Sequence, residues 1–123
     1  MKRRALMENL WAKEKYRVMM HSQGHYNLIR KELKQDIEME RLETLIGQAL
    51  EKTPDPGAVI NTFQHMWGYF KKVCSEKERR EYMRLKEEYI HNLNRPDDLF
   101  SFIRKMANKY KVKYLQNSTI LYK

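Results

Sequence analysis

Apolar side chains recur at intervals of three and four residues along almost the whole chain, and strict alternation of apolar and polar residues appears nowhere for long. The first spacing places side chains on one face of an α-helix, whereas alternation would indicate a β-strand. The composition favours the same structure, because only four glycines and three prolines interrupt 123 residues rich in Leu, Met, Glu, Lys and Arg. The sequence therefore predicts an all-α fold.

Three helices are expected in the first half of the chain. The first runs from about Arg4 to Met20, where apolar residues form one stripe. Ser22 offers an N-cap for the second helix. The third helix begins near Asp36 and ends before residues 53–57, whose two prolines and one glycine predict a turn.

The helix that follows this turn is the most hydrophobic and is expected at the centre of the bundle. It continues to Lys72 and has Gly68 in its interior, where glycine costs about 1 kcal/mol relative to alanine. Such a glycine indicates that another backbone or a ligand lies close. Polar residues form one face beside the apolar stripe, and either a helix crossing or a ligand groove fits them: Asn61, Gln64, His65, Gly68 and Lys72.

Two further helices and an ordered tail complete the predicted bundle. A capping box at residues 75–78 starts one helix, and Leu93 and Asn94 lie at its end. Pro96 can occupy the first turn of the last helix. Residues 113–123 are apolar enough to pack back onto the bundle. The length and this pattern predict one compact domain, residues 1–123, of five to six helices.

The charge is strongly basic and unevenly distributed. The net charge is +9, and residues 1–34 carry nine basic and three acidic side chains. Residues 35–56 carry six acidic and two basic side chains, and residues 96–123 are basic again. Chain ends often lie close together in small domains, so the two basic segments could form one face. The pattern fits either a polyanion-binding surface or ordinary solvated helix faces.

The sequence contains no known catalytic, metal-binding or cofactor-binding motif. Cys74 is the single cysteine, too few for a disulfide framework, a cysteine-only metal site or an iron–sulfur cluster. His21 and His25 are four residues apart, but Ser22 and Gly24 indicate a helix boundary between them. No phosphate-binding glycine loop, nucleophile elbow or dinucleotide fingerprint is present. We therefore expect a protein that is not an enzyme.

The expected compartment is the cytoplasm. No apolar run is long enough to span a bilayer, and charged residues interrupt the segment that would form an export signal. A lone cysteine is typical of a reducing compartment.

Basic residues interleaved with aromatic ones are a pattern typical of nucleic-acid binding, because Lys and Arg neutralise phosphates and tyrosines stack on unpaired bases. Four segments show it: Lys13–Arg17, His25–Lys34, Tyr69–Lys72 and Arg104–Tyr114. No named nucleic-acid-binding fold motif accompanies them, so the pattern predicts a polyanion partner without sequence specificity.

Three stretches resemble the YbgA family, an all-helical domain of unknown function. They are Leu-Trp-Ala-Lys-Glu-Lys-Tyr-Arg-Val-Met-Met-His-Ser at residues 10–22, Asn-Thr-Phe-Gln-His-Met-Trp-Gly-Tyr-Phe-Lys-Lys at residues 61–72, and Lys-Tyr-Leu-Gln-Asn-Ser-Thr-Ile-Leu-Tyr at residues 113–122. In many relatives this domain is fused to one similar to thiouracil desulfidases, which carries an iron–sulfur cluster. The resemblance implies that the helical part holds tRNA while the other domain removes sulfur.

The sequence thus predicts a non-catalytic module that binds tRNA or another structured RNA. One alternative is a helical adaptor for a separate enzyme, such as a desulfidase-like iron–sulfur protein acting in trans. A second alternative, a small-molecule or metal site between the first and fourth helices, requires His21 and His65 to meet at one cavity. The expected RNA-binding residues are Lys15, Arg17, His21, Tyr26, His65, Tyr69, Lys71, Lys72 and Lys109.

Overall fold

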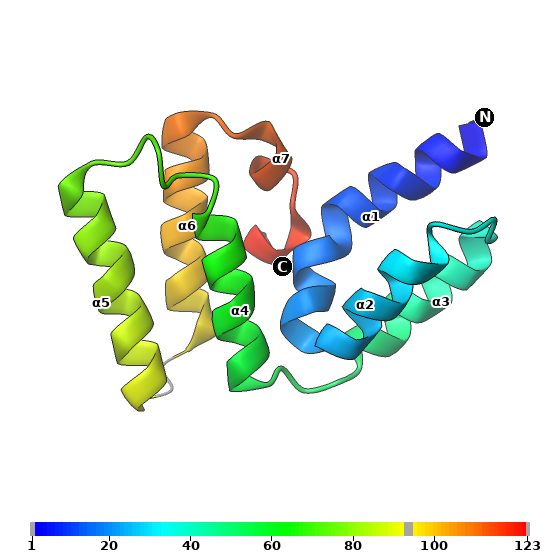
Figure 1. Ribbon diagram of the computed structural model, residues 1–123, viewed down its shortest axis with the longest axis horizontal. Helices are drawn as coiled ribbons and strands as arrows, with labels where there is room; N and C mark the ends of the chain where they lie inside the picture. Colours follow the sequence, from blue (N-terminus) through cyan, green and yellow to red (C-terminus); the bar gives the residue numbers. More distant parts are fainter. Residues whose placement is uncertain (1, 93–94, 123) are drawn as a thin grey trace.

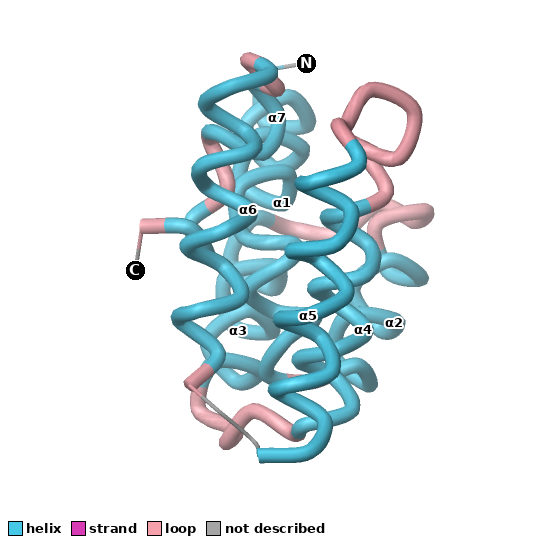
Figure 2. The backbone as a smooth tube through the Cα atoms, turned by 90° about the vertical axis from the view of Figure 1, so that its left-hand side faces the viewer, coloured by secondary structure: helices cyan, strands magenta, loops and turns pink. Residues whose placement is uncertain are grey.

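The computed structural model describes residues 2–92 and 95–122, and every regular element in these two ranges is a helix (Figure 2). The all-α prediction is therefore confirmed. Within these ranges no helix is both long enough and apolar enough for a membrane span. The helices in chain order are α1 (Lys2–His21), α2 (Gln23–Glu32), α3 (Met39–Leu50), α4 (Pro56–Trp67), α5 (Glu76–Asn92), α6 (Pro96–Tyr110), α7 (Lys113–Gln116) and the 3₁₀ turn η1 (Thr119–Leu121).

The helices form two groups of three (Figure 1). Helices α1, α2 and α3 pack on one another, and α4, α5 and α6 pack on one another. The contact between α1 and α4 joins the groups, and η1 bridges them by touching both α1 and α6. Helix α4, which was predicted to lie at the centre of the bundle, therefore lies there together with α1.

Short-range signals set most helix starts. The Ser22 side chain accepts a hydrogen bond from the His25 backbone N–H, as expected of an N-cap. Asp55 caps α4 in the same way, with Pro56 in the first turn. The third helix begins at Met39 and not near Asp36. Residues 36–38 have no regular secondary structure instead, and Arg3 forms ion pairs with the carboxylates of Asp36 and Glu38.

The prediction that α4 reaches Lys72 is wrong, because the helix ends at Trp67 and residues 68–73 form tighter turns. Backbone bonds from Tyr69 to Met66 and from Phe70 to Trp67 span only three residues. Gly68 is therefore the C-cap residue of α4 and not an interior glycine. A Cβ atom there would lie 3.1 Å from the His65 carbonyl oxygen, so the close neighbour is the preceding turn of the chain itself.

Stacked aromatic side chains form the core of the second group. The rings of Trp67 on α4 and Tyr82 on α5 lie parallel, with centroids 4.4 Å apart. Phe63 contacts Tyr82 and also meets Phe100 on α6 edge-on. Each such pair stabilises the fold by about 0.5–1.5 kcal/mol beyond simple burial.

The C-terminal tail packs back onto the bundle, as predicted. Leu115, Ile120 and Leu121 are buried. The Thr119 hydroxyl donates a hydrogen bond of 2.8 Å to the Glu14 carboxylate on α1, and Arg104 on α6 donates one of 2.9 Å to the Leu121 carbonyl. These contacts bring the basic C-terminal segment against the middle of α1.

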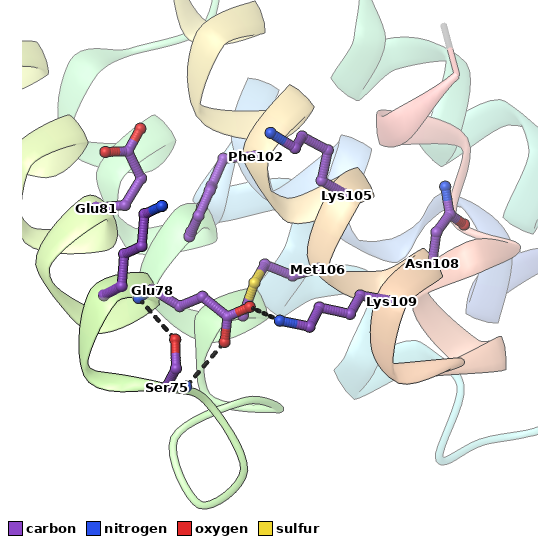
Figure 3. Close-up of a pocket in the computed structure, with 9 residues that line it drawn as sticks. Ser75, Glu78, Glu81, Phe102, Lys105, Met106, Asn108 and Lys109 are labelled. Atoms are coloured by element: carbon purple, nitrogen blue, oxygen red, sulfur yellow. Dashed lines mark hydrogen bonds and ion pairs between the residues drawn. The ribbon is translucent and has the colours of Figure 1, made fainter.

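Glu78 ties the start of α5 to the end of α6 (Figure 3). Its carboxylate accepts hydrogen bonds from the Ser75 backbone N–H, the Lys109 ammonium and the Tyr110 hydroxyl, at 2.8, 2.6 and 2.6 Å. The Glu78 backbone N–H in turn donates a hydrogen bond to the Ser75 hydroxyl, which confirms the predicted capping box. These donors, Lys109 first, lower the pKa of Glu78 to about 2. The end of α5 at Leu93 and Asn94 lies outside the described residues.

We expect Glu78→Ala to lower the free energy of unfolding by about 1–2 kcal/mol at pH 7, because it removes a cap and a charge-assisted hydrogen bond. The low pKa means that the folded state favours the ionised carboxylate. The stabilisation is therefore complete above the ordinary pKa of 4.5 and is lost as the pH falls toward 2. Urea unfolding should show that the loss of free energy of unfolding in Glu78→Ala is smaller at pH 3 than at pH 7.

The matched control is Glu87→Ala on the same helix, whose exposed carboxylate contacts His91 across one helical turn. This variant should change the free energy of unfolding by less than about 0.5 kcal/mol. An equal deficit for Glu78→Ala at both pH values would contradict the assigned role of its charge.

Candidate functional site

A cluster of three tyrosines and one lysine lies where the two groups of helices meet. The Tyr16 hydroxyl on α1 is 3.2 Å from the Tyr69 hydroxyl, which belongs to the turn after α4. The Tyr69 ring stacks on the Tyr114 ring of α7, with centroids 6.2 Å apart. The Lys15 ammonium lies 5.2 Å from the Tyr16 centroid and 5.1 Å from the Tyr114 centroid. We call these four residues the tyrosine–lysine cluster.

Local chain geometry sets the direction of each side chain. Consecutive residues on a helix point about 100° apart, so Tyr16 enters the seam between the groups while Lys15 stays at its rim. Tyr69 lies in the turn after Gly68, and its hydroxyl meets that of Tyr16 across the seam. Tyr114 reaches it because the tail docks on α1 through Thr119 and Glu14.

The cluster combines a buried anchor with an exposed aromatic surface. Tyr16 is buried, and burial together with the Tyr69 hydrogen bond raises its pKa well above the ordinary value of 10. Tyr69 and Tyr114 remain 42% and 39% exposed. Lys15 forms no ion pair with any residue that the structure describes.

This arrangement has two chemical capabilities. Exposed tyrosine rings offer π-faces on which an unpaired base or another flat ring can stack, at about 1–3 kcal/mol per base. An ammonium without a carboxylate partner can bind an anionic group next to that ring. The cluster therefore suits a ligand in which a flat ring and a negative charge lie close together, as in a nucleotide.

Tyr26 on α2 is buried, and its ring contacts are with residues outside the cluster. Its ring lies against Trp11, with centroids 5.8 Å apart, and the Arg30 guanidinium lies 5.7 Å from its centre. Among the predicted site residues, Lys15 and Tyr69 meet in the cluster, whereas Tyr26 contacts Trp11 and Arg30.

Arg17 and His21 occupy a different place on α1. Arg17 lies 3.5 Å from the Glu14 carboxylate, and His21 Nδ1 lies 2.7 Å from the Lys52 carbonyl oxygen. Both border a small cavity of about 120 Å³ whose other walls belong to α6 and η1. His65 does not line this cavity, so the two histidines do not meet there.

The remaining predicted residues are dispersed. His65 and Lys72 are exposed, and Lys71 lines a groove between α4 and α5. Lys109 is held by Glu78 in the α5–α6 cleft. Within residues 2–92 and 95–122, no three His, Cys, Asp or Glu side chains are grouped as metal ligands would be.

Sequence reasoning did not select Tyr16 and Tyr114 as site residues, although both lie within the basic segments with interleaved tyrosines. The sequence feature that could have identified them is their position directly beside Lys15 and Lys113. Nothing in the local pattern could show that residues separated by about a hundred positions share one ring–cation contact, because the docking of the tail creates it.

The fold and the cluster define a basic, all-helical domain with an exposed cation–aromatic surface. A comparison with protein-family models matches residues 15–123 to DUF1722, described as a protein of unknown function. The chain belongs to this family. Searches of curated proteins and of solved structures returned no match.

We expect Tyr16→Phe to lower the free energy of unfolding by about 0.5–1.5 kcal/mol at pH 7, because it removes the hydrogen bond to Tyr69 and keeps the ring. The raised pKa means that the folded state favours the protonated phenol. The stabilisation from the protonated Tyr16 hydroxyl is present below pH 10 and is lost above it. Between pH 9 and pH 11 the free energy of unfolding should therefore fall less in the variant than in the wild type.

Urea unfolding across this pH range measures both effects. Tyr122→Phe is the control, since Tyr122 is exposed and lies outside the cluster. Identical pH profiles for Tyr16→Phe and the wild type would contradict the buried position of the Tyr16 hydroxyl.

Proposed function

We propose that this domain binds RNA without catalysing a reaction on it, and that its ligand is tRNA. The observation that carries the proposal is the tyrosine–lysine cluster, in which the Lys15 ammonium lies about 5 Å from two tyrosine rings while Tyr69 and Tyr114 keep exposed ring surface. A nucleotide from a loop or an unpaired end would stack its base on this surface and place its phosphate near Lys15.

The net charge of +9 supports the same ligand class. Docking of the tail brings basic residues of the C-terminal segment to the middle of α1, and this raises the positive potential around the cluster. Such a field attracts any nucleic acid, whereas the exposed rings favour unpaired bases over a duplex.

The choice of tRNA comes from the resemblance to the YbgA family. Membership of DUF1722 agrees with that resemblance but adds no function of its own. In the proposed role the domain presents tRNA to a desulfidase-like iron–sulfur protein in trans, in the cytoplasm. The tRNA contact rests on the cluster, while this partner rests on the resemblance alone.

The test is binding of the purified protein to labelled tRNA across a salt series, with duplex DNA as competitor. Neutralising about five phosphates should give a log–log salt slope near −4. We expect Lys15→Gln and Tyr114→Ala each to weaken tRNA binding about tenfold, because one removes a phosphate contact and the other a stacking ring.

Two controls match these changes. Lys31→Gln removes the same charge from an exposed position on α2, and Tyr122→Ala removes an exposed tyrosine outside the cluster. Both should bind tRNA as the wild type does, and circular dichroism should show folded protein in all four variants. Equal affinity for duplex DNA and tRNA, unchanged by Lys15→Gln, would mean that the charge attracts polyanions without a site.

A second candidate function is a helical adaptor that docks on a separate enzyme. Met83 and Ile90 favour it, because both are exposed and lie seven residues apart on one face of α5. Ile90→Ser would weaken such docking and leave tRNA binding unchanged, because Ile90 lies outside the cluster and is exposed on α5. This variant therefore separates the two functions.

A further inference from the structure

A groove of about 460 Å³ runs between α4 and α5, away from the tyrosine–lysine cluster residues. Side chains that donate hydrogen bonds or carry positive charge dominate its lining, and no carboxylate is among them. The groove is lined by Gln64, Trp67, Lys71, Arg79, Tyr82, Met83 and Lys86.

Two of these donor groups belong to side chains that are largely buried, and neither donor has a partner within the described residues. Trp67 is 2% and Tyr82 is 7% exposed. Neither the Trp67 indole N–H nor the Tyr82 hydroxyl has a hydrogen-bond partner among the described residues, yet no fully buried side-chain nitrogen or oxygen in that part of the chain lacks one. Both polar atoms therefore keep a small accessible surface, and both side chains line the groove.

The ring faces of these residues are already occupied. Trp67 stacks on Tyr82 at 4.4 Å on one side and lies 6.0 Å from the Phe102 ring in a second stacked pair. The groove therefore offers no free face of these two rings for stacking. This distinguishes it from the cluster, where exposed ring surface is the main feature.

Three cations line the same groove as the two unpaired donors. Lys71 and Lys86 form no ion pair within the described residues, and Arg79 has only a long contact of 3.8 Å to the exposed Glu76 carboxylate. Lysine and arginine have no acceptor groups, and an indole N–H is a donor only. A ligand that satisfies this groove must supply several acceptor oxygens and negative charge.

We propose that the α4–α5 groove binds a phosphoryl group. Phosphate matches the lining because it is compact, charged and carries several acceptor oxygens, and arginine binds it through two parallel hydrogen bonds. The phosphoryl group belongs either to the RNA backbone or to a small phosphorylated compound. The site does not rest on the proposed RNA-binding function, since it uses none of the four cluster residues.

Trp67 supplies the readout. The chain contains two tryptophans, and Trp11→Phe leaves Trp67 as the single fluorescent indole, at the wall of the groove. In this background we expect inorganic phosphate and pyrophosphate to change the fluorescence saturably, and chloride at equal ionic strength not to do so. Pyrophosphate should bind more tightly because it carries more charge and more acceptors.

Variants test the assigned donors. Arg79→Gln and Tyr82→Phe should each weaken pyrophosphate binding about tenfold, the first by removing a charged donor and the second by removing only the hydroxyl. Arg80→Gln is the matched control, because it removes the same charge from the next residue of α5, which does not line the groove. Its affinity for pyrophosphate should equal that of the parent protein.

The two sources of phosphate give different results with tRNA. If the group belongs to the RNA backbone, Arg79→Gln weakens tRNA binding and pyrophosphate competes with tRNA. If it belongs to a small compound, Arg79→Gln weakens pyrophosphate binding alone. A response no larger than that to chloride, or equal losses in Arg79→Gln and Arg80→Gln, would overturn the site. Failure of tRNA binding in the wild type would overturn only the RNA-binding proposal.

Discussion

Tyr16 and Tyr69 share a hydrogen bond where two groups of three helices meet, and the candidate site depends on this seam. Their hydroxyls are held together by the packing of α1 on α4. The tail then closes over the same place, because Thr119 binds Glu14 on α1 and Tyr114 stacks on Tyr69. Separating the groups would therefore dismantle the aromatic surface before it unfolded any single helix.

Local features of the sequence account for most of the fold. The capping hydrogen bonds at Ser22, Asp55 and Ser75 each join residues three positions apart, so a local sequence pattern can indicate them. The end of α4 was missed because an interior glycine and a C-terminal glycine look alike in an apolar helix. Only the backbone bonds after Gly68 show that the chain tightens there.

The candidate site was less predictable because a sequence counts charges without showing their partners. In the sequence, Lys15, Arg17 and Lys109 are alike in being basic residues. In the structure, Arg17 contacts Glu14 and Lys109 is held by Glu78. Lys15 faces two tyrosine rings instead. Which lysine is available to a ligand is decided by contacts across as many as a hundred residues, and these depend on the docking of helices and tail.

The turn after α4 links the two surfaces of the molecule. Trp67 and Lys71 face the groove toward α5, while Tyr69, between them in sequence, faces α1 and α7. In a continuous α-helix, residues 67 and 69 would differ by about 200° and residue 71 would return near residue 67. The turns after Gly68 keep this division of sides, and Phe70 is buried beside Tyr110. The segment from Trp67 to Lys71 thereby presents ring surface toward α1 and α7 and positive charge toward α5.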